Sequence, residues 1–156
     1  MKLRHVLIAT TVLALVACGG GPVKRVSEPA AGIQQLSVRA DGRWDVVVRL
    51  DNFSSVPMRF ADANLDIAFD NGAAAKLKAQ PGISIGPESA DVFTVTLTPL
   101  PAGRARLANA LADGQGLNYT LGGTVEAGPE DGKPRSYKIE RKSALAPVPG
   151  PPGVLR

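Results

Sequence analysis

Acidic and amide side chains at alternate positions are the first feature of the sequence that suggests chemistry. Asp62, Asn64 and Asp66 supply oxygen atoms of the kind that calcium ions bind. The calcium loop of an EF-hand needs glycine at its sixth position and glutamate at its twelfth, where this sequence has Ile67 and Ala73. A spacing of two places the three polar side chains on one face of a β-strand. We interpret them as a solvated polar stripe and predict no metal site.

The segment from Met1 to Cys18 has the organisation of an export signal. Its start is basic, and Val6 to Ala17 is apolar apart from two threonines. An apolar run of about a dozen residues is too short for a membrane-spanning helix and fits the core of a secretory signal peptide. The last four residues, Leu15-Val16-Ala17-Cys18, resemble the bacterial lipobox.

The lipobox resemblance implies that residues 1–17 are a signal peptide and that Cys18 is the lipidation site. In such signals the cysteine receives fatty acyl chains, palmitate among them, and the peptide is cleaved before it. Two or three acyl chains hold a protein at a membrane far more firmly than one. Gly19 follows Cys18, where lipoproteins of the inner membrane typically have aspartate. We therefore predict a lipid anchor in the cell outer membrane, at its periplasmic face.

Histidine and free thiols would be missing from the mature chain. Cleavage before Cys18 removes His5, which is the one histidine, and acylation blocks the one cysteine. A single cysteine also excludes an internal disulfide and a zinc site built from cysteines. Catalytic triads and histidine acid–base catalysis need residues that this chain would lack. We predict that the protein is not an enzyme and has no catalytic residues, no cofactor and no metal.

The charge of the chain argues against nucleic-acid binding. The formal net charge is +4, but Lys2 and Arg4 belong to the predicted signal peptide. Between Ile33 and Lys142 basic and acidic side chains balance. The folded part therefore offers no basic surface for nucleic acid to favour.

Glycine and proline set both ends of the mature chain apart. Residues 18–32 begin with the lipidated Cys18 and continue through Gly19-Gly20-Gly21-Pro22, which predicts a flexible linker. Residues 143–156 are rich in proline and glycine and predict a disordered, polyproline-like tail, with a docking peptide as the alternative. Residues 33–142 remain as one folded domain.

Apolar and polar residues alternate through the central segment. Trp44 to Leu50 and Phe93 to Leu97 are two examples of this period of two, which is typical of antiparallel strands with one buried face. The alanine-rich segment from Arg104 to Asp113 has helical spacing instead. Pro101 marks the predicted start of this helix, and Asp113-Gly114 marks its end. These patterns predict an all-β fold: a seven-stranded antiparallel sandwich, immunoglobulin-like or fibronectin-like, with one short helix.

One hairpin can be predicted to its register. A three-residue loop, Asp70 to Gly72 with Gly72 in the left-handed conformation, sets Leu65 against Leu77 on the buried face. A two-residue turn at Asn71-Gly72 would instead set Leu65 against Lys78. Because a slip by one residue turns a whole face inside out, we expect the first register.

The order of these elements resembles the late embryogenesis abundant (LEA) type 2 family, also called the water-stress and hypersensitive-response domain. In that family a long strand runs into an Asn-Pro-Asn turn, and here Asn52 matches the first residue while Phe53 and Ser54 depart from the triplet. Tyr119 to Gly123 resembles the closing strand of the family. The resemblance covers about Ile33 to Lys142. It implies a sandwich with one helix, no catalytic residues and a role in stress, especially water loss.

We expect a membrane-anchored, non-catalytic envelope lipoprotein with a desiccation-protective or chaperone-like role. Its partners would be the membrane, reached through lipid on Cys18, and client or envelope proteins. Two alternatives stay open. One is an interaction or assembly module of the outer membrane. The other is a sandwich that binds lipid or a small ligand, which would require an apolar cavity between the sheets. The oligomeric state does not follow from the sequence.

Overall fold

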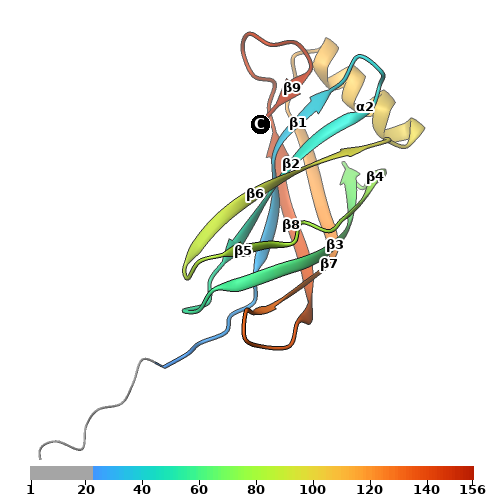
Figure 1. Ribbon diagram of the computed structural model, residues 1–156. Helices are drawn as coiled ribbons and strands as arrows, with labels where there is room; N and C mark the ends of the chain where they lie inside the picture. The colour runs from blue at the N-terminus through green and yellow to red at the C-terminus, as the bar shows by residue number, and fades with distance from the viewer. Residues whose placement is uncertain (1–22) are drawn as a thin grey trace, which may run out of the picture.

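Residues 23–156 form two antiparallel β-sheets and one helix (Figure 1). The computed structural model describes residues 23–156, so the predicted signal peptide, Cys18 and the start of the predicted linker lie outside it. The elements in chain order are β1 (Ala30–Val38), β2 (Trp44–Asn52), β3 (Met58–Phe69), β4 (Gly72–Ala79), β5 (Ile83–Ile85), β6 (Ser89–Leu97), α2 (Pro101–Ala112), β7 (Leu117–Pro129), β8 (Arg135–Leu145) and β9 (Val154–Leu155).

The number of strands differs from the expectation. Residues 23–156 form nine strands, not seven. One sheet has the order β6-β2-β1-β9, and the other has β4-β3-β7-β8 with β5 also paired to β3. The two additional strands, β5 and β9, have only three and two residues. Two or three residues are too few for an alternating pattern to be recognised. Whether such a segment forms a strand depends on the partner with which it pairs.

The space between the sheets is filled with apolar side chains. Alternate residues of β2 point inward, and Trp44, Val46, Val48 and Leu50 are all buried. Trp44 from one sheet meets Phe69 from the other, with ring centroids 5.7 Å apart. Burying such a side chain contributes about 2–3 kcal/mol. In residues 23–156 no helix is both long enough and apolar enough to cross a membrane.

The β3–β4 hairpin confirms the predicted register and corrects its turn. Leu65 lies opposite Leu77, as expected. The positive φ angles, however, belong to Asp70 (46°) and Asn71 (70°), while Gly72 is already in β4. Two consecutive residues with positive φ fit the type I′ turn, whose twist matches that of the strands. The pairing shifts between Ile67 and Ala68, so the extra residue of the bulge is Ala74 and not a loop residue.

The bulge at Ala74 is where α2 packs. The backbone N–H of Leu100 donates to the Ala74 carbonyl at 2.8 Å, just before the helix begins at Pro101. A Cβ on Gly103 would lie 2.5 Å from the Ala74 Cα, so only glycine permits this approach. The helix begins at Pro101 and ends at Ala112, as the sequence predicts, and the bond from Leu100 to Ala74 holds its start against β4.

Both ends of the chain are more ordered than the sequence suggests. β1 begins at Ala30, inside the range predicted to be a flexible linker. The disordered tail predicted for residues 143–156 is not what the structure has. β8 extends to Leu145, and the chain then returns so that β9 pairs with β1. Leu155 is fully buried, and its burial together with the uncovered edge of β1 explains the order of the tail.

Candidate functional site

The predicted lipidation site, Cys18, lies outside the described residues. The description begins five residues later in the sequence, at Val23. Val23 to Pro29, here called the strap, runs along the connection between β2 and β3. The strap, that connection, the β5–β6 turn and the β7–β8 loop gather at one end of the sandwich, here called the base. Helix α2 and β9 lie at the opposite end (Figure 1). The described residues that follow Cys18 most closely in the sequence thus lie at the base.

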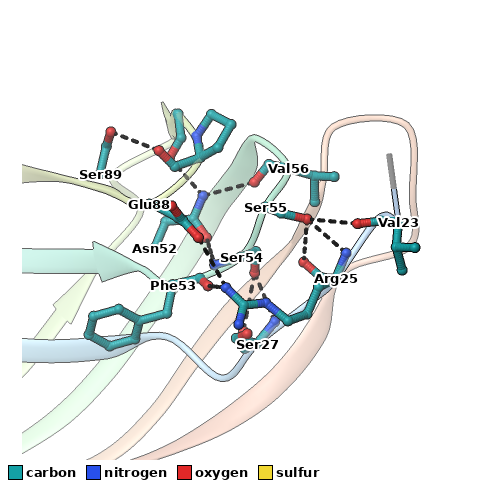
Figure 2. Close-up of polar contacts among 12 residues, drawn as sticks. Val23, Arg25, Ser27, Asn52, Phe53, Ser54, Ser55, Val56, Glu88 and Ser89 are labelled. Carbon is teal, nitrogen blue, oxygen red and sulfur yellow. Dashed lines mark hydrogen bonds and ion pairs between the residues drawn. The ribbon is translucent and has the colours of Figure 1, made fainter. Parts of the chain in front are cut away.

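Two serines of the β2–β3 connection hold the strap (Figure 2). The buried Ser54 hydroxyl accepts from the Ser27 backbone N–H at 2.9 Å and lies 3.3 Å from the Ser27 carbonyl. The Ser55 hydroxyl accepts from the Arg25 N–H at 2.8 Å. The Ser55 N–H donates to the Arg25 carbonyl at 2.9 Å. The strap therefore has hydrogen-bond partners like those of a strand, although no element is assigned to it.

Arg25 ties the strap to a third segment. Its guanidinium donates to the Phe53 carbonyl at 3.2 Å and to the Glu88 carboxylate at 3.1 Å. The Glu88 N–H in turn donates to the Ser54 carbonyl at 3.1 Å. Both charged side chains are exposed, so the ion pair itself contributes at most about 1 kcal/mol. Its main consequence is that the guanidinium charge is balanced locally.

Asn52 holds the β2–β3 connection through hydrogen bonds of its side chain. Its buried side-chain amide lies within hydrogen-bond distance of three carbonyls, those of Val56 at 2.9 Å, Ile85 at 3.1 Å and Gly86 at 2.8 Å. Its side-chain oxygen accepts from the Ser54 N–H at 2.9 Å. A buried polar group is stable only when it is paired in this way. Asn52, which carries the sequence resemblance at this turn, thus joins the β2–β3 connection to the end of β5.

The surface of the base combines exposed apolar side chains with a recess. Val23, Val26 and Phe53 are 87%, 44% and 51% exposed. Beside them is a recess of about 280 Å³. It is lined by Lys24, Val26, Val56, Pro57 and residues 129–132. Sequence analysis missed this surface, although the pair Phe53 and Val26 in polar surroundings was a signal that could have pointed to it.

Larger recesses lie on the polar outer face of the second sheet. One of about 590 Å³ is bordered by Asp70, Asn118 and Lys142, and one of about 500 Å³ by Asp62, Asn64 and Lys78. Both are shallow and open at the surface. Neither is the apolar cavity between the sheets that a lipid-binding sandwich would need.

The polar stripe of β3 has the face that its spacing predicts. Asn64 and Asp66 are exposed and lie opposite Lys78 and Lys76 of β4. Asp62 accepts a hydrogen bond from Gln80 at 3.0 Å. The neighbours of these groups are therefore cations and amides. Within residues 23–156 no group of three or more histidine, cysteine, aspartate or glutamate side chains could hold a metal ion.

A group of shifted pKa values lies far from the base, at the start of β2. The Thr96 hydroxyl donates to Asp45 at 2.5 Å and, with help from Arg39, holds the pKa of that carboxyl below its usual value. Asp45 in turn raises the pKa of Arg39 by its hydrogen bond and charge. A hydrogen bond from Arg43 lowers the pKa of Asp41. These shifts keep each group ionised near neutral pH, which suits solvated ion pairs and not a proton donor.

Comparison with known proteins identifies the fold alone. No protein-family model matches the chain, and no curated protein matches it. Several solved structures resemble it. A protein from Arabidopsis thaliana has a TM-score of 0.50 at 14% identity, covering 81% of this chain and 82% of that chain. A protein from Archaeoglobus fulgidus has a TM-score of 0.45 at 15% identity, covering 79% and 98%.

A third similar structure is that of a candidate LEA protein. Its TM-score is 0.48 at 10% identity, and the match covers 93% of this chain and 86% of that chain. The structural neighbours thus include a protein described by the LEA name, which is the name of the family that the sequence resembles. The match with a TM-score of 0.50 shows a shared fold. Identities this low carry no site residues from one chain to another.

Proposed function

We propose that this protein is a lipid-anchored, non-catalytic lipoprotein of the outer membrane with a protective or chaperone-like role in water stress. The observation that carries the anchoring part is the strap. It begins five residues after the lipobox cysteine in the sequence and is fastened to the base by Ser54 and Ser55. A strap of this kind gives the domain a defined end toward an anchor at Cys18.

The stress role rests on the sequence resemblance to the LEA type 2 family. Asn52, which matches the family's turn, is fully used in holding the β2–β3 connection. Gly123, in the closing strand, sits where a Cβ would come 2.3 Å from the Asn64 carbonyl oxygen, so that strand packs closely on β3. Both residues support the architecture of such a domain.

Lipidation is tested with the full chain produced in a Gram-negative host. We expect the mature protein to begin at Cys18, to carry acyl chains by mass spectrometry and to sediment with the outer membrane on a density gradient. The Cys18→Ser variant should remain an unacylated precursor. A mature protein with an unmodified Cys18 thiol would exclude the anchor. Sedimentation with the inner membrane would exclude the proposed location alone.

The protective role is tested with residues 19–156, a range that keeps the strap and β9. A labile enzyme is dried with this protein or with albumin at equal mass, and its activity is measured after rehydration. We expect clearly better recovery than with albumin at low molar ratio. Equal recovery would refute specific protection and leave the anchor intact. Crosslinking in envelopes would then test the alternative, an assembly module that binds an outer-membrane partner.

We also propose that the sandwich is of the immunoglobulin or fibronectin-like type. In that fold the first, second and fifth strands share one sheet, and the third, sixth and seventh share the other. Here β1, β2 and β6 share one sheet and β3, β7 and β8 the other. The fourth strand departs from the constant-type order, in which it joins the first sheet, because β4 pairs with β3. The short strands β5 and β9 are then additions at the edges. Interstrand proton contacts measured by NMR between β2 and β6 and between β3 and β7 would test this order.

A further inference from the structure

We propose that the base of the domain is a lipid-contacting surface. In this arrangement the exposed side chains of Val23, Val26 and Phe53 lie in the boundary between headgroups and acyl chains of the membrane that holds Cys18. The inference deepens the proposed function and rests on its lipid anchor. It adds an orientation and a set of contacts that an anchor at the end of a free linker would not produce.

Chain length limits how far the base can be from the membrane. Val23 follows Cys18 by five residues, and a fully extended chain covers at most about 18 Å over that distance. The strap is fastened from Arg25 onward, so it adds no slack. β3 alone has 12 residues, a length of about 40 Å. Helix α2 lies at the opposite end of the sandwich from the base (Figure 1). In the proposed arrangement it is therefore farther from the membrane than the base is.

This end holds three of the six exposed large apolar side chains in residues 23–156. Val23, Phe53 and Val26 are the three most exposed of the large apolar side chains in residues 23–156. All three belong to the strap or to the connection that it contacts. Figure 2 shows Phe53 and Val23 directed away from the hydrogen-bonded network between them. Single exposed apolar residues are ordinary on a protein surface, but their gathering at one end marks an interaction surface.

The polar groups that join the strap to the β2–β3 connection are already paired, which lowers the cost of contact with lipid. Ser54 and Ser55 satisfy backbone groups of the strap, and Glu88 balances the charge of Arg25. A polar group that entered the headgroup region without a partner would lose its hydration. The prearranged bonds allow the apolar side chains to approach acyl chains without that penalty.

The charges at the base predict which lipids it contacts. Lys24 is accompanied by the carboxylates of Glu130 and Asp131, which border the same recess. The base is therefore not a basic patch, and attraction to anionic headgroups is not its source of binding. We expect contact with a zwitterionic surface, driven by apolar side chains and insensitive to salt.

The test uses the full acylated chain in phosphatidylethanolamine-rich vesicles. Acylation occupies the thiol of Cys18, so an added cysteine is the one site for a thiol-reactive fluorophore. Phe53→Cys reports on the base, and Leu100→Cys, at the opposite end and also exposed, is the matched control. We expect lipids carrying a quencher to quench the label at position 53 at least threefold more than at position 100. The difference should persist in high salt.

The outcomes separate this inference from the anchor. Acylated protein that sediments with vesicles but shows equal quenching at positions 53 and 100 overturns the lipid-contacting base and leaves the anchor. Protein without acylation overturns both. Ser54→Ala, which removes the hydroxyl that holds Ser27, provides a second measurement. If the strap orients the base, this variant should remain anchored and lose most of the difference in quenching. An unchanged difference would show that the strap does not set the orientation.

Discussion

The Ser54 hydroxyl accepts a hydrogen bond from the backbone N–H of Ser27 at 2.9 Å, across 27 residues of chain. The same hydroxyl lies 3.3 Å from the Ser27 carbonyl, so one side chain serves both backbone groups of one residue. A neighbouring strand would provide the same pairing through its backbone. The strap is consequently part of the domain, and the chain between Cys18 and the domain is shorter than the linker that the sequence predicts.

Removing the Ser54 hydroxyl should release the strap. In Ser54→Ala the Ser27 N–H loses its partner, and we expect the free energy of unfolding to fall by about 1–2 kcal/mol. Trypsin should also cleave faster at Lys24 and Arg25. Urea titration and limited proteolysis measure the two effects. Ser89→Ala, which alters an exposed hydroxyl at the same end, is the control and should change neither.

The amide of Asn52 should be essential for the β2–β3 connection. Asn52→Asp keeps the shape but places a carboxylate against three carbonyls. We expect a loss of about 3 kcal/mol in the free energy of unfolding at pH 7. Burial favours the neutral acid, which can donate, so part of the loss should be recovered toward pH 4. The exposed Asn64→Asp is the control. Equal effects of the two variants in urea titrations would contradict this account.

The contact between α2 and β4 should reverse the usual effect of adding alanine to a helix. Replacing glycine by alanine within an exposed helix stabilises it by about 1 kcal/mol. Gly103→Ala instead places a methyl group 2.5 Å from the Ala74 Cα. We expect a net loss of about 1–3 kcal/mol, measured by thermal or urea unfolding. A stabilised variant would show that the helix does not approach the bulge this closely.

The short strand β9 should stabilise the first sheet. Leu155→Ala removes a fully buried side chain, and we expect a loss of about 2 kcal/mol, at the low end of the range because a chain end can readjust. Deleting residues 154–156 should also expose the edge of β1 and promote aggregation, measured by light scattering. Val154→Ala, in the same strand but partly exposed, should have a smaller effect. A soluble, equally stable deletion variant would assign β9 no role.

Asp45, at the start of β2, should make the free energy of unfolding depend on pH. Because the pKa of Asp45 is lower in the folded protein than in the unfolded chain, its contribution is present above about pH 4 and is lost as pH falls through the folded value. Thr96→Val removes the largest cause of the shift and should reduce the loss of stability between pH 7 and pH 2.5. Thr94→Val is the exposed control on the same strand. Equal pH profiles of the two variants would contradict this assignment.

Much of the architecture follows from local pattern. The alternation in β2 and β3 identifies their buried faces, and the choice between Leu77 and Lys78 opposite Leu65 settles the hairpin register. The turn was assigned wrongly because the extra residue can be placed either in the loop or in the strand. The tertiary contact with α2 decides for Ala74, whose carbonyl binds the Leu100 N–H.

The candidate surface is a different case. Val26 and Phe53 stand out as apolar residues in polar surroundings, but nothing in their spacing brings them together. Val26 and Phe53 are separated along the chain, and they share one end of the molecule only because Ser27 reaches Ser54. Neither the strap nor β9 shows a periodic pattern, since each is too short and obtains its order from a distant partner. By itself the sequence determined which faces of the long strands are buried, because that depends on alternation along one segment. Only the tertiary structure decided where the strap and β9 attach, because the segments with which they pair lie far away in the sequence.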